Sequence, residues 1–596
     1  MSLFTAAMDK YQLGENGHVE NKWAKGSELE NIQEQIVQLS FQCVRTTSTG
    51  LDSLAGKLDV LLDSIKPRIL NETDMVKKGY YIDYLVRCFQ LVGMTRDIET
   101  GKGERDLAYM MLFVWWGHFP RFAEQCLRYF VLSPIDGKPP YGSWKDIKRM
   151  CQYVHLKTGT KSHPLIEYAT GLMCDQLRAD SMEDTQQLSL VARWVPRESS
   201  NAYGWLFCKL AAKMFPEYLD TAEKKGGHER KTRALTKAKM MFSRLIVQLN
   251  RRIDTTQIKM CDRDWSNINP HRVPSVLLMK NRAAFLNKTK KGEQKNDSID
   301  RMLCAKNFEA YINERVKTGK TVKGSKVGIT DFVKQGIELS KVPESTQQTV
   351  LNAQWEDFLS KMTDGLNMVA MVDQSGSMLG DPYDAAMGLG LAIASKSALG
   401  RRVMTFSSEP RWISLEKKET LIDGIKELRK YDWEAGLGTD FFKALSLLLN
   451  ACVSASLPND VVAGMTLAIL SDMQIDSYTN KVLPTDTYKN TDVNNSFDKR
   501  MEDMHRKIAR MYNEAGYTDV PHLLFWNLRH TSGFPTLSTM KGATMFSGFS
   551  PVLLNSFCMK GVEALKQTTP WDSFCALVDG DRYNCLRQIV EQEFSM

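Results

Sequence analysis

The sequence lacks the features of a membrane, secreted or zinc protein. No run of 18 or more apolar residues occurs in its 596 residues, so we expect no membrane-spanning helix. The first residues carry neither the basic region nor the long apolar core of a signal peptide. The 12 cysteines include no C-x-x-C pair, and the nine histidines are dispersed. Free buried thiols are therefore favoured over a zinc site, and we expect a cytoplasmic protein without membrane contact.

The composition that is present is that of an ordinary globular protein. Hydrophobic residues make up 43% of the chain and charged residues 25%, which is enough to bury substantial cores. The length allows about four domain-sized units or two larger ones. The net charge of +8, from 78 basic and 70 acidic residues, supports a polyanion partner only weakly, so the distribution of charge matters more.

Hydrophobic patterning divides the chain into three parts. Residues 1–30 are polar and contain several glycines, which predicts an N-terminal arm. In residues 31–345 apolar residues recur at three- and four-residue spacing, which predicts an all-α solenoid or irregular helical array. No repeat of fixed period is visible there. In residues 346–596 apolar strands alternate with helices, which predicts an α/β domain with a doubly wound parallel sheet.

The strands and helices of the α/β part can be placed by their residue patterns. We expect strands at residues 369–373, 402–407, 465–471, 522–526 and 544–547. We expect helices at residues 383–397, 419–428, 440–453 and 497–512. Residues 476–496 are rich in Asp, Asn, Thr and Lys, which predicts a polar surface insertion.

A metal-ligand pattern follows the first of these strands. Asp373, Ser375 and Ser377 come directly after the apolar run Met368–Val372. Open α/β sheets bind their ligands at the carboxyl ends of the strands, where this loop would lie. One carboxylate and two hydroxyls suit a hard cation such as Mg²⁺. Helix capping could explain each serine separately, because Ser and Asp also satisfy free N–H groups at helix starts.

Two later elements add oxygen ligands at the same predicted edge. Thr439 lies in the glycine-rich turn Gly436–Asp440, and Asp472 follows the predicted strand 465–471. With these additions the pattern resembles the five-residue metal-ion-dependent adhesion site of von Willebrand factor A domains. That resemblance implies a Rossmann-like fold in which Mg²⁺, or another divalent cation, keeps one coordination position open for an acidic ligand. The residues implied as ligands are Asp373, Ser375, Ser377, Thr439 and Asp472.

The helical part contains a charged, glycine-bearing stretch, residues 95–106. Arg96 and Arg105 could hold phosphates there or pair with the neighbouring acids, and the balanced charge favours pairing. This stretch, Asn16-Gly17 and the segment Tyr141–Asp146 resemble the TROVE module of the Ro autoantigen. That module is a ring of HEAT-like helical repeats followed by a von Willebrand A-like domain.

A closer resemblance is to an uncharacterised family with the same domain order in plants, fungi and large DNA viruses. The residues that carry it are Ala192–Arg197, Lys259–Ser266, Arg272–Ser275 and Phe525–Arg529. The distant Ro relatives imply binding of structured or single-stranded RNA. Trp115, Trp116 and Trp194 lie within apolar periods, and we expect them in the core rather than stacked on bases.

Basic residues concentrate in two segments of the helical part. Residues 224–252 carry ten Lys and Arg against one acid, and residues 280–326 carry thirteen against five. Such clusters suit contacts with a nucleic-acid backbone, although a solvated charged face would look the same. The candidate RNA-binding residues are Lys224, Lys225, Arg230, Lys231, Arg233, Lys237, Lys239, Lys288, Lys290 and Lys291.

Three functions are compatible with these patterns. The first is a non-enzymatic binding protein that holds RNA on its helices and an acidic protein ligand at the metal. The second is a protein–protein assembly factor, packaged in the virion if the protein is viral, in which the basic segments are only surface. The third and weakest is a metal-dependent hydrolase, because Ser and Thr outnumber carboxylates in the motif and two-metal hydrolysis usually needs more acids and a general base.

Overall fold

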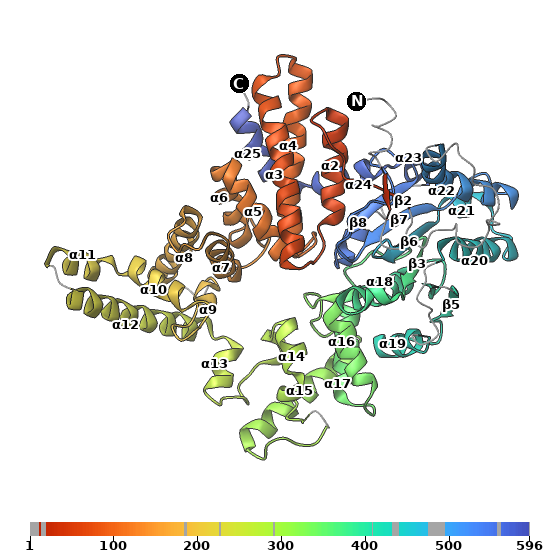
Figure 1. The fold of residues 1–596 in the computed structure, drawn as a ribbon. Coiled ribbons are helices and arrows are strands. Elements are labelled where there is room, and N and C mark those ends of the chain that lie inside the picture. The colour runs from red at the N-terminus through yellow and green to blue at the C-terminus, as the bar shows by residue number, and fades with distance from the viewer. Residues whose placement is uncertain are drawn as a thin grey trace.

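A computed structural model shows a helical N-terminal region followed by a C-terminal domain built on a six-stranded mixed sheet (Figure 1). The predicted order, helices first and a sheet with parallel strands second, is confirmed. The structure describes residues 11–13, 19–183, 188–225, 228–289, 292–407, 409–431, 440–474, 495–556 and 562–594.

Consecutive helices of the N-terminal region pack against one another, as α5 packs on α6 and α7 on α8. Local signals set their ends: the Asp74 carboxylate accepts the first N–H groups of α4, and Gly159 takes the left-handed conformation that ends α7. These helices are α2 (Leu29–Gln42), α3 (Ser48–Asn71), α4 (Met75–Arg96), α5 (Asp106–His118), α6 (Pro120–Val131), α7 (Lys145–Thr158), α8 (Pro164–Met182), α9 (Val191–Trp194), α10 (Gly204–Met214), α11 (Pro216–Lys225) and α12 (His228–Ile253).

A smaller helical unit with its own core follows α12. The rings of Phe285 and Phe308 stack at its centre, with 4.5 Å between centroids. The next helix, α16 (Ile329–Ser340), packs instead against helices of the sheet domain. The remaining elements here are α13 (Thr256–Cys261), η1 (Pro270–Arg272), α14 (Ser275–Phe285), α15 (Ile299–Lys317) and α17 (Thr346–Leu359).

The sheet has the strand order β5-β4-β3-β6-β7-β8. Every neighbouring pair is parallel except β4 with β5, which is antiparallel. Successive strands are added on one side of β3 up to β5 and on the other side from β6 onward, so the strand order reverses between β3 and β6. Ligands of open α/β sheets bind at such a switch point. The strands are β3 (Met368–Asp373), β4 (Arg402–Phe406), β5 (Arg411–Ser414), β6 (Thr466–Ser471), β7 (His522–Asn527) and β8 (Ala543–Ser547).

Helices connect and cover these strands, and α18 packs directly on β3. They are η2 (Gly376–Met378), α18 (Asp381–Lys396), α19 (Leu421–Arg429), α20 (Phe441–Ser454), α21 (Asn459–Ala463), α22 (Asn495–Glu514), η4 (Pro551–Ser556), α23 (Val562–Gln567), α24 (Pro570–Val578), η5 (Asp581–Tyr583) and α25 (Asn584–Phe594).

The sequence placed five of the six strands within one residue at each end. Every residue of β3, β6 and β7 is buried, which is why unbroken apolar runs marked them. The antiparallel edge strand β5 was missed, because its four residues lack such a run and form a strand by pairing with β4. The predicted insertion at 476–496 lies largely outside the described residues, which resume at residue 495.

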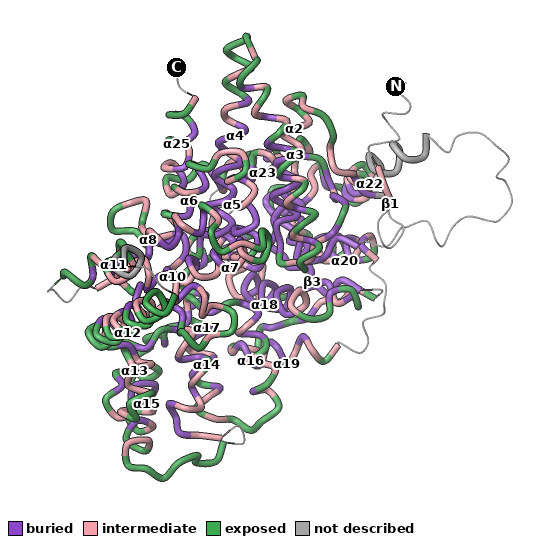
Figure 2. Tube along the Cα trace, turned by 60° about the vertical axis from the view of Figure 1, so that its left-hand side comes forward, coloured by how far each residue is buried: buried purple, intermediate pink, exposed green. Residues whose placement is uncertain are grey.

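The helical region and the sheet share one continuous core (Figure 2). Helix α2 packs on β8, and α25 at the end of the chain packs on α4. Buried Lys102 fixes this contact, because its Nζ donates to the carbonyls of Ser40 and Cys43 and to the Ser547 hydroxyl, at 2.7, 3.1 and 2.6 Å. The two parts are therefore joined by packing and by buried hydrogen bonds.

Three smaller features complete the fold. In the arm, β1 (Tyr11–Leu13) pairs with β2 (Val19–Asn21), and Asn21 exchanges backbone hydrogen bonds with Phe534. The described cysteines form no disulfide, and most of them are buried. Among the described residues, no helix is long and apolar enough to cross a membrane.

Candidate functional site

Asp373 lies at the carboxyl end of β3, beside the switch point of the sheet. Its side chain is completely buried. Oδ1 accepts the N–H of Ser375 at 2.8 Å, and Oδ2 accepts the hydroxyl of Ser471, the last residue of β6, at 2.5 Å. These bonds fold the loop back over the strand end and tie the two central strands together.

Ser375 and Ser377 present their hydroxyls side by side, with 3.0 Å between the two Oγ atoms. Ser375 is buried and Ser377 is exposed, because the chain turns outward through η2. The pair therefore leads from the buried Asp373 carboxylate to the protein surface.

Asp472 supplies a second buried carboxylate at the same edge, directly after β6. Its Oδ1 accepts the N–H of Gln474 at 3.2 Å, and its Oδ2 accepts Nη1 of Arg529 at 3.2 Å. Arg529 comes from the loop after β7 and is partly exposed. Burial, and then the nearby charge of Lys57 in the helical region, lower the pKa of the neighbouring His530.

The electrostatics of this edge favour a cation. Burial and the negative charge of Asp472 raise the pKa of Asp373 to about 6, against the opposing effect of the hydrogen bonds from Ser471 and Ser375. Two carboxylates held close together without water repel one another. A bound divalent cation would relieve that repulsion, so the donor set fits Mg²⁺.

The fifth predicted ligand, Thr439, lies outside the described residues. The adjacent Asp440 is described: its N–H donates to the carbonyl of Ser407, which follows β4, at 3.4 Å. Its carboxylate caps α20 by accepting the N–H of Lys443 at 3.0 Å. Of the predicted ligands, the structure thus brings together Asp373, Ser375, Ser377 and Asp472, which we call the sheet-edge site.

Conventional metal clusters are absent from the part of the chain that the structure describes, where no three His, Cys, Asp or Glu side chains form a metal-binding group. The sheet-edge site differs from such a cluster because half of its ligands are hydroxyls. Oxygen-only sets of this kind bind Mg²⁺ with several waters retained.

The predicted RNA-binding residues do not form one cluster. Arg230, Lys231, Arg233 and Lys237 are exposed on α12, which projects from the body of the molecule (Figures 1 and 2). On this helix Arg233 pairs with Glu229 at 2.9 Å, and Lys239 pairs with Glu198, which follows α9, at 2.6 Å. The Nζ atom of Lys237 lies 4.5 Å from the centroid of the Tyr218 ring.

The other predicted RNA-binding residues are elsewhere. Lys288 follows α14 in the smaller helical unit. Lys224 and Lys225 end α11. Lys290 and Lys291 lie outside the described residues.

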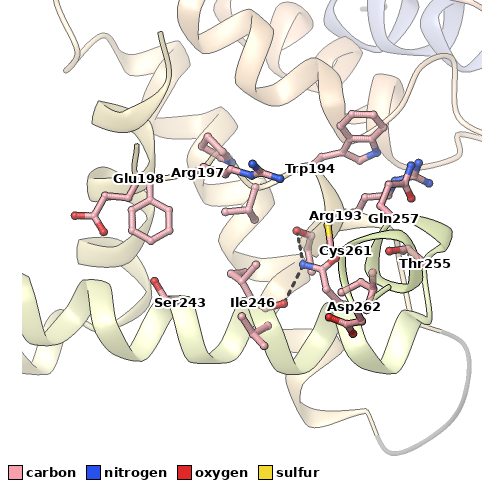
Figure 3. A pocket seen from close by; sticks show the side chains of 17 residues that line it. Arg193, Trp194, Arg197, Glu198, Ser243, Ile246, Thr255, Gln257, Cys261 and Asp262 are labelled. Atoms are coloured by element: carbon pink, nitrogen blue, oxygen red, sulfur yellow. Dashed lines mark hydrogen bonds between the residues drawn. The ribbon is translucent and has the colours of Figure 1, made fainter. Parts of the chain in front are cut away.

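A pocket of about 560 Å³ lies between α9, α12 and α13, and the sequence analysis did not predict it (Figure 3). Two of the motifs singled out in the sequence, Ala192–Arg197 and Lys259–Ser266, meet in its wall. Trp194, expected in the core, is only partly buried at the edge of this pocket, whereas Trp115 is fully buried. The sequence motifs pointed to these two segments, but nothing in their spacing predicted that the segments would lie together in the fold.

Two domain families and one viral protein that match this chain carry no assigned activity. Residues 166–367 match a domain of unknown function, DUF2828, and residues 367–579 match another, DUF7788. The chain is 26% identical over 489 residues to Uncharacterized protein L728 of Acanthamoeba polyphaga mimivirus, covering 78% of this chain and 75% of that protein. The pocket falls within the first matched segment and the sheet-edge site within the second.

Proposed function

We propose that this protein is a non-enzymatic binding protein that captures an acidic ligand through a divalent cation at the sheet-edge site. One observation carries this proposal: two buried carboxylates and a pair of hydroxyls converge at the switch point of a mostly parallel sheet. Asp373, Ser375, Ser377 and Asp472 would hold the cation, with Thr439 as a fifth ligand. When bound, the cation supplies an open coordination position for a carboxylate.

The strand order supports a von Willebrand A-like assignment for the sheet domain. Counted within that domain, the order is 3-2-1-4-5-6 with an antiparallel third strand, and its switch point is where such sheets bind ligands. The helical region before it supports the TROVE-like comparison, in which HEAT-like helices precede such a domain.

RNA binding by the helical region is a second candidate function. The exposed cations of α12, above all Arg233 with 79% of its side chain accessible, favour it. If the cations of α12 form only a solvated surface, the alternative to RNA binding is a protein–protein assembly factor. Affinity for single-stranded RNA that falls steeply with salt, and falls less steeply in an R233Q/K237Q variant, would support RNA. No binding at low salt would remove this candidate.

The metal proposal is tested with Asp373→Asn, which removes the charge and keeps the shape. Mg²⁺ at a hundredfold excess over its Kd should stabilise the parent by about 2.7 kcal/mol and should not stabilise D373N. Thermal unfolding with Mg²⁺ and with EDTA measures this difference.

The matched control is Asp180→Asn, because Asp180 is also buried and also accepts a serine hydroxyl, from Ser189 at 2.7 Å. D180N should respond to Mg²⁺ as the parent does. Equal stabilisation of the parent and D373N would refute the site.

A further inference from the structure

Five cationic side chains converge where the starts of α5 and α7 meet α9. We call them the basic cluster: Arg105, Lys145, Lys148, Arg149 and Arg193. None of the five forms an ion pair or a side-chain hydrogen bond with any residue that the structure describes. The Nε atom of Arg149 is buried without a partner. Charges in a structural network are normally paired, so this cluster is unusual.

The indole of Trp194 holds three of these charges close together. The Nζ atoms of Lys145 and Lys148 each lie 5.3 Å from the ring centroid, and Cζ of Arg193 lies 5.4 Å from it. Cations at this distance are attracted to the ring face, but the ring carries no charge that neutralises them. Trp194 thus positions the cations without compensating them.

The nearest acid on α7 is already used. Asp146 accepts Nε and Nη2 of Arg96 at 3.0 and 2.7 Å, and also binds the hydroxyl of Tyr109 and the N–H of Ser143. It therefore forms its hydrogen bonds and its ion pair with buried Arg96 and its neighbours, and acts on Lys145 only through its charge.

The cluster carries uncompensated positive charge as a result. Burial first, and then the charges of Arg149, Arg105 and Lys148, lower the pKa of Lys145 to about 8, although Asp146 acts in the opposite direction. Burial also lowers the pKa of Lys148 and of Arg193. Holding these cations together costs folding free energy, which an anion would recover.

The pocket beside the cluster supplies a place for an organic group. Arg193 and Trp194 belong to both, and Figure 3 shows them at the pocket edge. The walls are mostly apolar, from residues such as Phe207, Ile246 and Val247. The volume of about 560 Å³ is that of a small-molecule site.

One residue of the pocket wall has a polar atom without a partner. The Oε1 atom of Gln257, which lines the pocket, is buried and accepts no hydrogen bond from any described residue. A buried acceptor without a donor is costly. An amino group on a flat ring would satisfy it once the Gln257 side chain turns toward the pocket.

We propose that the basic cluster and this pocket bind a nucleotide carrying several phosphates, with the phosphates on the cations and the base in the pocket beside Gln257. Five convergent cations match an anion that concentrates several charges in a small volume, whereas a single carboxylate would neutralise only one. The nucleotide could be free or could be the phosphorylated end of an RNA strand. This inference does not depend on the sheet-edge proposal.

Calorimetric titration of the full chain in EDTA tests the inference. The probes are ATP, adenosine, inorganic tripolyphosphate, and one short single-stranded RNA with either a 5′-triphosphate or a 5′-hydroxyl. ATP should bind about tenfold more tightly than tripolyphosphate and about a hundredfold more tightly than adenosine. Preference for the triphosphorylated RNA over ATP would identify an RNA end as the ligand, and the reverse would identify a free nucleotide.

Two variants separate the cluster from the pocket. Lys145→Gln with Lys148→Gln should weaken ATP about 30-fold. Val247→Trp, which fills the pocket from an exposed wall position, should weaken ATP about tenfold and leave tripolyphosphate unchanged. The control, Arg233→Gln with Lys237→Gln, keeps the cluster intact and removes the same number of positive charges from α12.

The outcomes decide the inference. Failure of both ATP and triphosphorylated RNA to bind the parent would overturn it. Equal loss in the cluster variant and the α12 control would also overturn it, because the effect would then be general electrostatics. D373N should bind ATP as the parent does, so failure of the sheet-edge proposal would leave this result unaffected.

Discussion

The sheet-edge site and the basic cluster are opposite in charge and in origin. At the sheet edge, negative side chains converge because parallel strands end on the same side of the switch point. At the basic cluster, positive side chains converge from three helical elements that are distant in sequence. The first arrangement follows from topology, and the second from how particular helices pack.

Both sites bring like charges close together, although at the sheet edge Arg529 pairs with Asp472. Asp373 lies near a second buried acid, and Lys145 lies near three other cations. Perturbed titration caused by burial and by like charges is typical of functional sites. Arg96 and Asp146 form a buried ion pair, and this contrast shows that the protein does pair opposite charges elsewhere.

The loop of residues 95–106 contacts both the sheet domain and the basic cluster, so the two sites depend on the same structural contacts. Asp97 binds Arg582 near the end of the chain, Lys102 binds the end of β8, and Arg105 belongs to the basic cluster. We expected Arg96 and Arg105 to pair with neighbouring acids. The structure corrects this: Arg96 pairs with distant Asp146, and Arg105 forms no ion pair with the described residues.

Asp97→Ala should have the largest effect on stability, because it removes the contacts between this loop and the end of the chain. Asp97 is fully buried and accepts Arg582 at 2.5 and 2.8 Å and the Tyr583 hydroxyl at 3.0 Å. Losing one partner of a buried pair should lower the free energy of unfolding by about 3–5 kcal/mol. Urea unfolding measures the loss, and exposed Asp136→Ala is the control. A loss of unfolding free energy no larger than that of the control would show that the contact between this loop and the end of the chain does not stabilise the protein.

Lys102, which joins the helical region to the sheet, should make the stability of the protein depend on pH. Burial lowers its pKa from 10.5 to about 8, so between these values the unfolded chain binds more protons than the folded one. The parent should therefore gain stability relative to Lys102→Met as pH rises from 8 to 10.5, by up to about 3 kcal/mol. Unfolding of both proteins across this range tests the sign, and a constant difference would contradict the burial of a charged amine.

The smallest effect expected is stabilisation by the K145Q/K148Q variant. Removing mutually repelling, partly exposed cations should raise the free energy of unfolding by about 0.5–1 kcal/mol while nucleotide binding weakens. Thermal unfolding without ligand measures it. Destabilisation instead would assign these lysines a structural role and weaken the contrast with the paired Arg96.

The sequence predicted the sheet edge better than the basic cluster for a physical reason. Unbroken apolar runs locate buried parallel strands, and their order along the chain brings Asp373 and Asp472 to one edge. Lys145, Lys148 and Arg149 do share one helix face by their spacing. Their meeting with Arg193 and Trp194 depends on how α7 packs near α9, which no local pattern reveals.

The sheet-edge claim is tested most directly by a crystal structure of the protein soaked in Mn²⁺, which replaces Mg²⁺ and scatters anomalously. The account predicts one strong anomalous peak within about 2–2.5 Å of the hydroxyls of Ser375 and Ser377. It also predicts that this peak is absent in D373N crystals. A parent structure without a peak at this edge, or a peak that persists in D373N, would contradict the account.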